Sequence, residues 1–89
     1  MTTHQSLPVS GYKPQSQAKV DLVNENKELE ERVLRQLDKL ATLTAVNGET
    51  VDIDKRWLAI GRTHLEQAFM AINRSIFRPE RVTLPGDGP

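Results

Sequence analysis

Tyr12 is the only tyrosine in the 89-residue chain, and it stands between Gly11 and Lys13. It falls in a short polar segment before the first helical pattern, where a lone aromatic ring has little core to join. A ring beside an ammonium group can instead close over a flat ligand, and Lys27 adds a second positive charge fifteen positions further on. Stacking and two ammonium groups together suit a nucleotide. An anchor that pins this segment onto a neighbouring subunit is an equally good interpretation of Tyr12.

Composition narrows the classes of function. The 12 Lys and Arg residues balance the 12 Asp and Glu residues, so no broad positive field exists to hold a DNA or RNA backbone. The chain contains no cysteine, which excludes disulfides, thiolate metal sites and a cysteine nucleophile. No apolar run approaches the roughly 18 residues of a membrane span, and the first residues lack the apolar core of a signal peptide. We therefore expect a soluble, cytosolic protein with one small domain.

No pattern of catalytic or metal-binding residues stands out. Serine, histidine and carboxylate residues do not gather at a sharp turn, and no glycine-rich phosphate loop leads into a helix. His64 and Glu66 are two positions apart, so they face different sides of a helix and make a poor metal site. The sequence predicts no catalytic residues, no metal and no cofactor, and hence a protein that is not an enzyme.

The chain divides into three segments. Residues 1–15 are polar, contain two prolines, and are interpreted as an N-terminal arm. Residues 16–79 carry helical periodicity and form the domain. Residues 80–89 are rich in proline and glycine, so we expect a loose tail.

Two helices account for the middle segment, and they predict an all-α fold. Ser16 can cap a first helix over residues 17–43, and Asp54, or Asp52 before it, can cap a second over residues 55–78. Pro79 ends the second helix, because the residue before a proline is disfavoured in helical geometry. Two helices of similar length with a connection of about ten residues favour an antiparallel hairpin.

The helices carry apolar stripes that are expected to face each other, and Asn47-Gly48 marks the turn between them. The stripes comprise Leu22, Leu29, Val33, Leu37 and Leu40 on the first helix, and Leu58, Gly61, Leu65, Ala68, Phe69, Ile72 and Ile76 on the second. Gly61 and Ala68, seven positions apart, are expected to let the two backbones approach closely.

Further apolar residues lie off these stripes, and they predict self-association. They are Val20, Val23, Leu34 and Ala41 on the first helix, and Trp57, Ile60 and Phe77 on the second. A monomer rarely leaves so large an apolar surface in water. A single hairpin core is also marginal against chain entropy at roughly 25 cal/mol per Å² of buried apolar area. We therefore expect an obligate, compact homo-oligomer.

Three polar or aromatic residues have structural interpretations as well as functional ones. Trp57 opens the second helix and is expected to pack at a hairpin end or a subunit interface rather than on a ligand. Asn26 interrupts the first stripe and is interpreted as a polar pair that sets helix register. Arg74 lies beside the second stripe, where it could pair with a carboxylate or hold an anion.

Several segments together resemble the phage anti-CBASS cyclic-oligonucleotide sponge family. The resemblance covers about residues 11–79, and the spacing of Tyr12 and Lys27 fits the binding pair of the family. The segments that carry it are residues 11–13, 20–24, 56–63, 65–67, 69–70 and 74–76, with Lys27.

The resemblance implies a small helical protein that assembles as a homohexamer in the cytoplasm of the infected bacterium. It implies sequestration, without cleavage, of cyclic dinucleotides such as cyclic GMP-AMP, which carry the CBASS defence signal. By position, Tyr12 would stack on a base, Lys27 would contact a phosphate, Gly11 would let the arm fold over, and Lys13 would assist.

Some members of the family also hold cyclic trinucleotides between three protomers. For such a second site, the resemblance points to Arg74 and then to Arg62.

Two other classes of function stay open. One is a structural or adaptor oligomer whose second apolar face docks a host helix. The other is a small helical DNA-binding repressor, which the zero net charge disfavours. The sequence therefore predicts a partner among small cyclic nucleotides and its own copies, with no nucleic acid polymer and no membrane.

Overall fold

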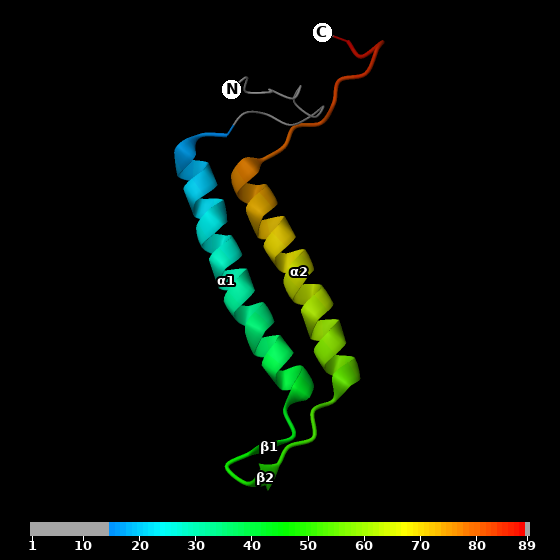
Figure 1. The fold of residues 1–89 in the computed structure, drawn as a ribbon. Helices are drawn as coiled ribbons and strands as arrows, with labels where there is room; N and C mark the ends of the chain where they lie inside the picture. Colours follow the sequence, from blue (N-terminus) through cyan, green and yellow to red (C-terminus); the bar gives the residue numbers. More distant parts are fainter. Residues whose placement is uncertain (1–14, 89) are drawn as a thin grey trace, which may run out of the picture.

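A computed structural model of the protein describes residues 15–88. Two long helices, α1 (Gln17–Thr42) and α2 (Lys55–Phe77), lie side by side and run antiparallel (Figure 1). Two short strands, β1 (Ala45–Val46) and β2 (Glu49–Thr50), connect them. The predicted all-α antiparallel hairpin is confirmed, and each helix ends one residue earlier than the sequence predicted.

The helix ends form where the sequence places capping residues. The hydroxyl of Ser16 accepts a hydrogen bond from the backbone N–H of Lys19 at 3.3 Å. The carboxylate of Asp54 accepts from two backbone N–H groups in the first turn of α2, at 3.0 and 3.1 Å. Arg78 adopts left-handed geometry (φ 48°) directly before Pro79, so the chain leaves the axis of α2 at this point.

The connection between the helices is a small β-hairpin, although the sequence predicted only a loop with a turn. Ala45 of β1 pairs with Thr50 of β2 in antiparallel register. Asn47 and Gly48 both have positive φ, 50° and 80°, which is the backbone geometry of a type I′ turn. The predicted turn residues are therefore confirmed. The strands were missed because two residues on each side are too few to show alternation.

The contact between α1 and α2 contains little fully buried surface. Among the described residues, only the apolar side chain of Val23 is buried, with 4 % of its surface exposed. The half-buried residues of the contact are Val20, Asn26, Leu34, Leu37 and Leu40 on α1, and Leu58, Leu65, Phe69 and Ile76 on α2. One hairpin therefore has almost no core of its own.

The predicted stripe of α1 is partly wrong. Leu22 and Leu29 are each 50 % exposed and Val33 is 38 % exposed, whereas Val23 and Leu34 face α2 instead. The helix is therefore rotated by about a quarter of a turn from the predicted orientation. Both sets of positions follow helical periodicity, so the pattern could not select between them.

The predicted close approach at Gly61 and Ala68 is also wrong within one chain. Both residues are exposed, and a Cβ atom added at Gly61 would meet nothing within 4 Å. Ile72, from the same predicted stripe, is 47 % exposed. These residues lie beside the α1–α2 contact rather than in it.

These exposed positions share one side of the hairpin. Each residue advances about 100° around a helix, and antiparallel helices turn in opposite senses as seen from one end. On both helices, the exposed residues are displaced from the contact residues in the same sense along the sequence. Because the two helices run in opposite directions, both sets of exposed residues lie on the same flank of the contact. We call this the apolar side; it consists of Leu22, Leu29, Val33, Gly61, Ala68 and Ile72.

A polar pair interrupts the contact between the helices. The side-chain amide of Asn26 donates to the side-chain oxygen of Asn73 at 3.1 Å, and both residues are half-buried. The predicted pairing role of Asn26 is confirmed, and the partner belongs to the same chain. The Asn26–Asn73 bond satisfies polar groups that would otherwise lose hydration against apolar neighbours.

We expect Asn26→Ala to destabilise the protein by about 1–2 kcal/mol, because Asn73 is left half-buried without its partner. A single domain of this size would lose roughly 4–8 °C of Tm per kcal/mol. Thermal unfolding at one fixed protein concentration measures the effect. The matched double variant, Asn26→Leu with Asn73→Leu, should recover the loss, since both polar groups are removed together. Equal Tm values for the single and double variants would contradict this role.

Candidate functional site

Three of the predicted ligand-binding residues, Gly11, Tyr12 and Lys13, lie outside the described residues. Gln15 is the first of the described residues, and its side-chain amide donates to the backbone oxygen of Phe77 at 3.1 Å. This bond fixes the base of the arm to the end of α2. The arm therefore starts at the open end of the hairpin, opposite the β-hairpin (Figure 1).

Lys27 lies on α1, where its side chain is exposed. Within residues 15–88, its ammonium group makes no hydrogen bond or ion pair. It borders a shallow hollow of about 460 Å³ on the surface of α1, whose lining residues are Lys27, Glu28, Glu31, Arg32 and Arg35. Lys27 thus offers an uncompensated positive charge to a ligand.

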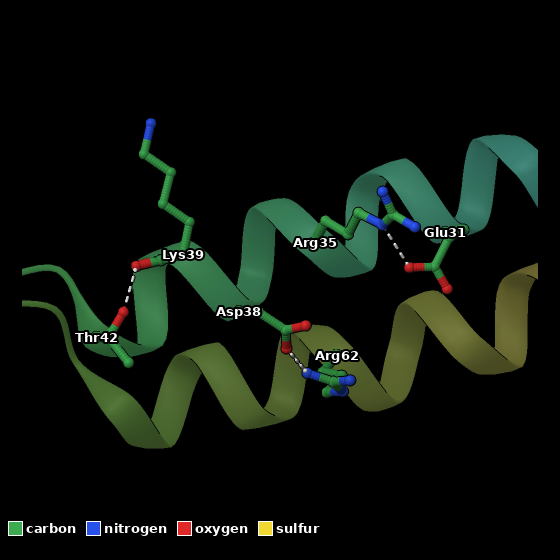
Figure 2. A network of polar contacts seen from close by, with 6 residues as sticks. All are labelled: Glu31, Arg35, Asp38, Lys39, Thr42 and Arg62. Atoms are coloured by element: carbon green, nitrogen blue, oxygen red, sulfur yellow. Dashed lines mark hydrogen bonds and ion pairs between the residues drawn. The ribbon is translucent and has the colours of Figure 1, made fainter.

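The two arginines of this hollow were not predicted as site residues. They follow Lys27 by five and eight positions, and all three line the hollow. Arg35 is held by Glu31, four positions before it, with its Nε 2.9 Å from the carboxylate (Figure 2). Glu28 stands four positions before Arg32, but the two form no ion pair, so Arg32 is a second cation without an ion-pair partner among residues 15–88.

Arg62 already has a partner. Its guanidinium donates to the carboxylate of Asp38 at 2.9 Å, and this ion pair bridges α2 and α1 (Figure 2). The hydrogen bond and charge of Asp38 raise the pKa of Arg62, with smaller contributions from the charges of Glu66 and Glu31. Because acidic groups compensate its charge, Arg62 is a weak candidate for holding an anion.

Arg74 is exposed near the end of α2, and its guanidinium makes no ion pair or hydrogen bond in the described part of the chain. It is twelve residues from Arg62, or about 18 Å along the helix. The structure therefore does not bring these two arginines together. Of the two residues expected at a second site, Arg74 has the free charge.

The family of the chain follows from comparison with known families. The sequence model described as "Acb2/Tad1, hairpin domain" matches residues 6–77. The chain belongs to this family. It is the anti-CBASS sponge family that the sequence predicted, and its members are sponge-type phage proteins. Comparison with curated proteins and with solved structures gave no match.

The Acb2/Tad1 match contains both helices and every predicted site residue. It begins before Gly11 and extends through Lys27, Arg62 and Arg74. The segment after Phe77 lies outside the match. All of the residues predicted for a binding site therefore lie within the matched domain.

Other features of this Acb2/Tad1 hairpin bear on binding. No group of three potential metal ligands occurs among residues 15–88, and His64 is exposed. No helix in that part of the chain is long and apolar enough to cross a membrane.

Trp57 is 65 % exposed, so its predicted packing at the hairpin end is wrong, and a place at a subunit interface stays a prediction.

Proposed function

We propose that this Acb2/Tad1 hairpin protein binds cyclic dinucleotide signals of the CBASS defence, such as cyclic GMP-AMP, and sequesters them without cleavage. Binding would occur in the cytoplasm of the infected bacterium. The observation that supports this proposal most directly is the exposed, unpaired ammonium group of Lys27 on α1. The hydrogen bond from Gln15 to the end of α2 adds support, because it fixes the base of the Tyr12 arm at the start of α1, the helix that carries Lys27.

The separation of these groups suits a cyclic dinucleotide. Gln15 and Lys27 are twelve residues apart, or about 18 Å along α1. Three residues join Gln15 to Tyr12 and can span about 10 Å. An arm folded back along α1 would bring the backbone of Tyr12 to within about 8 Å of the level of Lys27 along the helix axis. A base stacked on the ring and a phosphate at the ammonium group would fill this gap.

The energies of such contacts are large enough for a sponge. Stacking contributes about 1–3 kcal/mol per base, and a charge-assisted hydrogen bond to phosphate about 1.5–3 kcal/mol. A two-fold interface between protomers would present Tyr12 and Lys27 twice to a ligand with two bases and two phosphates. Two of each contact total about 5–12 kcal/mol before the cost of ordering the arms, so the upper end of this range approaches nanomolar affinity.

We also propose that the protein assembles as a homohexamer. The apolar side of the hairpin is the surface that supports self-association, because it exposes Leu22, Leu29, Val33 and Ile72 next to the small residues Gly61 and Ala68. Lys27 lies on the opposite flank of α1 by helical geometry. Packing through the apolar side would therefore leave Lys27 accessible.

A second site for cyclic trinucleotides is proposed at Arg74. Its guanidinium is unpaired among the described residues, whereas that of Arg62 binds Asp38. A ligand with three phosphates requires three such cations, which only several protomers can supply. Arg74 from three chains would meet this requirement, with Arg62 contributing less.

Incubation of the protein with a cyclic dinucleotide, followed by removal of free ligand, heating and extraction, tests the function. We expect intact nucleotide in the extract in amounts that match the protein. A linear or hydrolysed product would identify an enzyme and overturn the proposal. No retained nucleotide would favour the alternative of an adaptor, whose exposed apolar side docks a host helix.

We expect Tyr12→Ala to lose most of its affinity for cyclic dinucleotides, by about five- to 150-fold for each base contact of 1–3 kcal/mol. Helicity and assembly should stay unchanged, because the substitution lies outside both helices. Calorimetry, circular dichroism and sedimentation measure the three properties. Tyr12→Phe keeps the ring and should retain binding. Dissociation of Tyr12→Ala would identify a subunit anchor and contradict the ligand-closing role.

A further inference from the structure

The segment after α2 has a defined local structure, although the sequence predicted a loose tail. Residues 79–83 form neither helix nor strand, and Leu84-Pro85-Gly86-Asp87 forms a tight turn. The N–H of Asp87 donates to the backbone oxygen of Leu84 at 3.1 Å. The N–H of Leu84 donates to the carboxylate of Asp87 at 2.8 Å. Pro85 and a positive φ of 93° at Gly86 are typical of a type II turn.

This turn displays an apolar side chain next to a carboxylate. Leu84 is 64 % exposed and Val82 is 50 % exposed. Both are large apolar side chains that face solvent. The hydrogen bond between Leu84 and Asp87 keeps the carboxylate beside the leucine. The turn therefore presents an exposed leucine next to an acidic group.

A complementary hollow of about 280 Å³ lies between the helices near the β-hairpin. Its apolar lining consists of Leu37, Ala41, Leu58 and Ala59, and the stems of Lys55 and Arg62 complete it. The two alanines leave the space because their side chains are short. The ammonium group of Lys55 stands at the rim, where it donates to the backbone oxygen of Ala41 at 2.6 Å and keeps two further N–H groups for other acceptors.

The tail of the same chain does not occupy this hollow. It runs away from the hairpin beyond the open end (Figure 1). The residues that line the hollow lie on the halves of α1 and α2 next to the β-hairpin. The hollow is therefore open to a segment of another chain.

We propose that the C-terminal tail of one copy docks into this hollow of a second copy. Leu84 enters between Ala41 and Ala59, and the carboxylate of Asp87 meets the ammonium group of Lys55. The contact joins two different surfaces, the tail of one copy and the hollow of the next, so it can repeat from copy to copy. The copies form a closed ring only if the rotation between neighbours brings the last copy back to the first. It uses a segment outside the Acb2/Tad1 match and does not depend on the proposed ligand.

Paramagnetic labelling of the full-length chain tests this contact. The protein has no cysteine, so Gly88→Cys provides a single site for a spin label; a Cβ atom there would meet nothing within 4 Å. This copy is mixed, by unfolding and refolding together, with a copy that carries ¹³C-labelled alanine methyl groups. We expect the methyl signals of Ala41 and Ala59 to lose most of their intensity, while that of Ala18 near the open end changes least.

Substitutions on the spin-labelled copy separate this contact from others. Leu84→Ser should restore both methyl signals, whereas Thr83→Ser, at the neighbouring exposed position, should leave the loss unchanged. Lys55→Gln on the methyl-labelled copy should weaken the contact about two- to fivefold, as for an exposed ion pair. Unchanged Ala41 and Ala59 signals, or a loss that persists with Leu84→Ser, would overturn the proposal.

Discussion

Lys27→Ala should weaken binding of cyclic dinucleotides roughly thirty- to a thousand-fold, the equivalent of about 2–4 kcal/mol for a lost phosphate contact. Binding of a cyclic trinucleotide should be unaffected. Arg74→Ala should do the reverse, because its unpaired guanidinium lies on the other helix and is proposed to serve a different set of subunits. Each substitution removes an exposed charge that has no partner within residues 15–88, so the fold should lose little stability.

Calorimetry across a panel of cyclic di- and trinucleotides measures both effects. Lys39→Ala is a matched control, because Lys39 is also an exposed lysine on α1 whose ammonium group has no partner in the described structure. It should bind both ligands as the unmodified protein does. Equal losses for both ligands in either Lys27→Ala or Arg74→Ala would mean one shared pocket or a damaged assembly, and the proposal of two sites would fail.

Leu29→Glu should dissociate the protein into single chains and reduce its helicity. Leu29 is half exposed at the centre of the apolar side. A carboxylate at this position would be buried against another copy without a partner, which costs several kcal/mol for each occurrence. A symmetric assembly repeats the substitution in every copy, so the penalty is multiplied.

Sedimentation velocity and circular dichroism over a range of concentrations measure this dissociation. Asn24→Glu adds the same charge to an exposed position of α1 away from the apolar side, and it should leave the assembly intact. A stable, helical species with the mass of one chain, observed for the unmodified protein at micromolar concentration, would contradict the prediction of obligate self-association.

The sequence predicted the helices well because their ends depend on local chemistry. Ser16, Asp54 and Pro79 act through backbone groups within a turn of their own position, and Asn47-Gly48 fixes its own turn. The orientation of α1 depends on a choice that is not local. Val23 and Leu29 belong to two periodic sets, and nothing in the spacing distinguishes a contact within the chain from one between chains.

The candidate site shows the same limit. Lys27 was predicted by its spacing from Tyr12, and its free, exposed ammonium group agrees with a binding role that awaits measurement. The pairing of Arg62 with Asp38 joins residues 24 positions apart on different helices, so no i,i+4 pattern could reveal it. Arg32 stands four positions after Glu28, a spacing that favours an ion pair, yet the two residues form no pair in the described part of the chain.

The presence of Val23 as the only buried apolar side chain among residues 15–88 has a kinetic consequence. Under the proposed self-association, a chain with so small a core would gain most of its stability from other copies, so its helices should become stable only when copies meet. The rate at which native protein appears should then rise with the concentration of newly made chains rather than stay constant, as it does for a two-state monomer. Early in synthesis, when copies are scarce, most chains would be incompletely folded and open to proteolysis. The delay before the protein becomes active would therefore be set by the expression level.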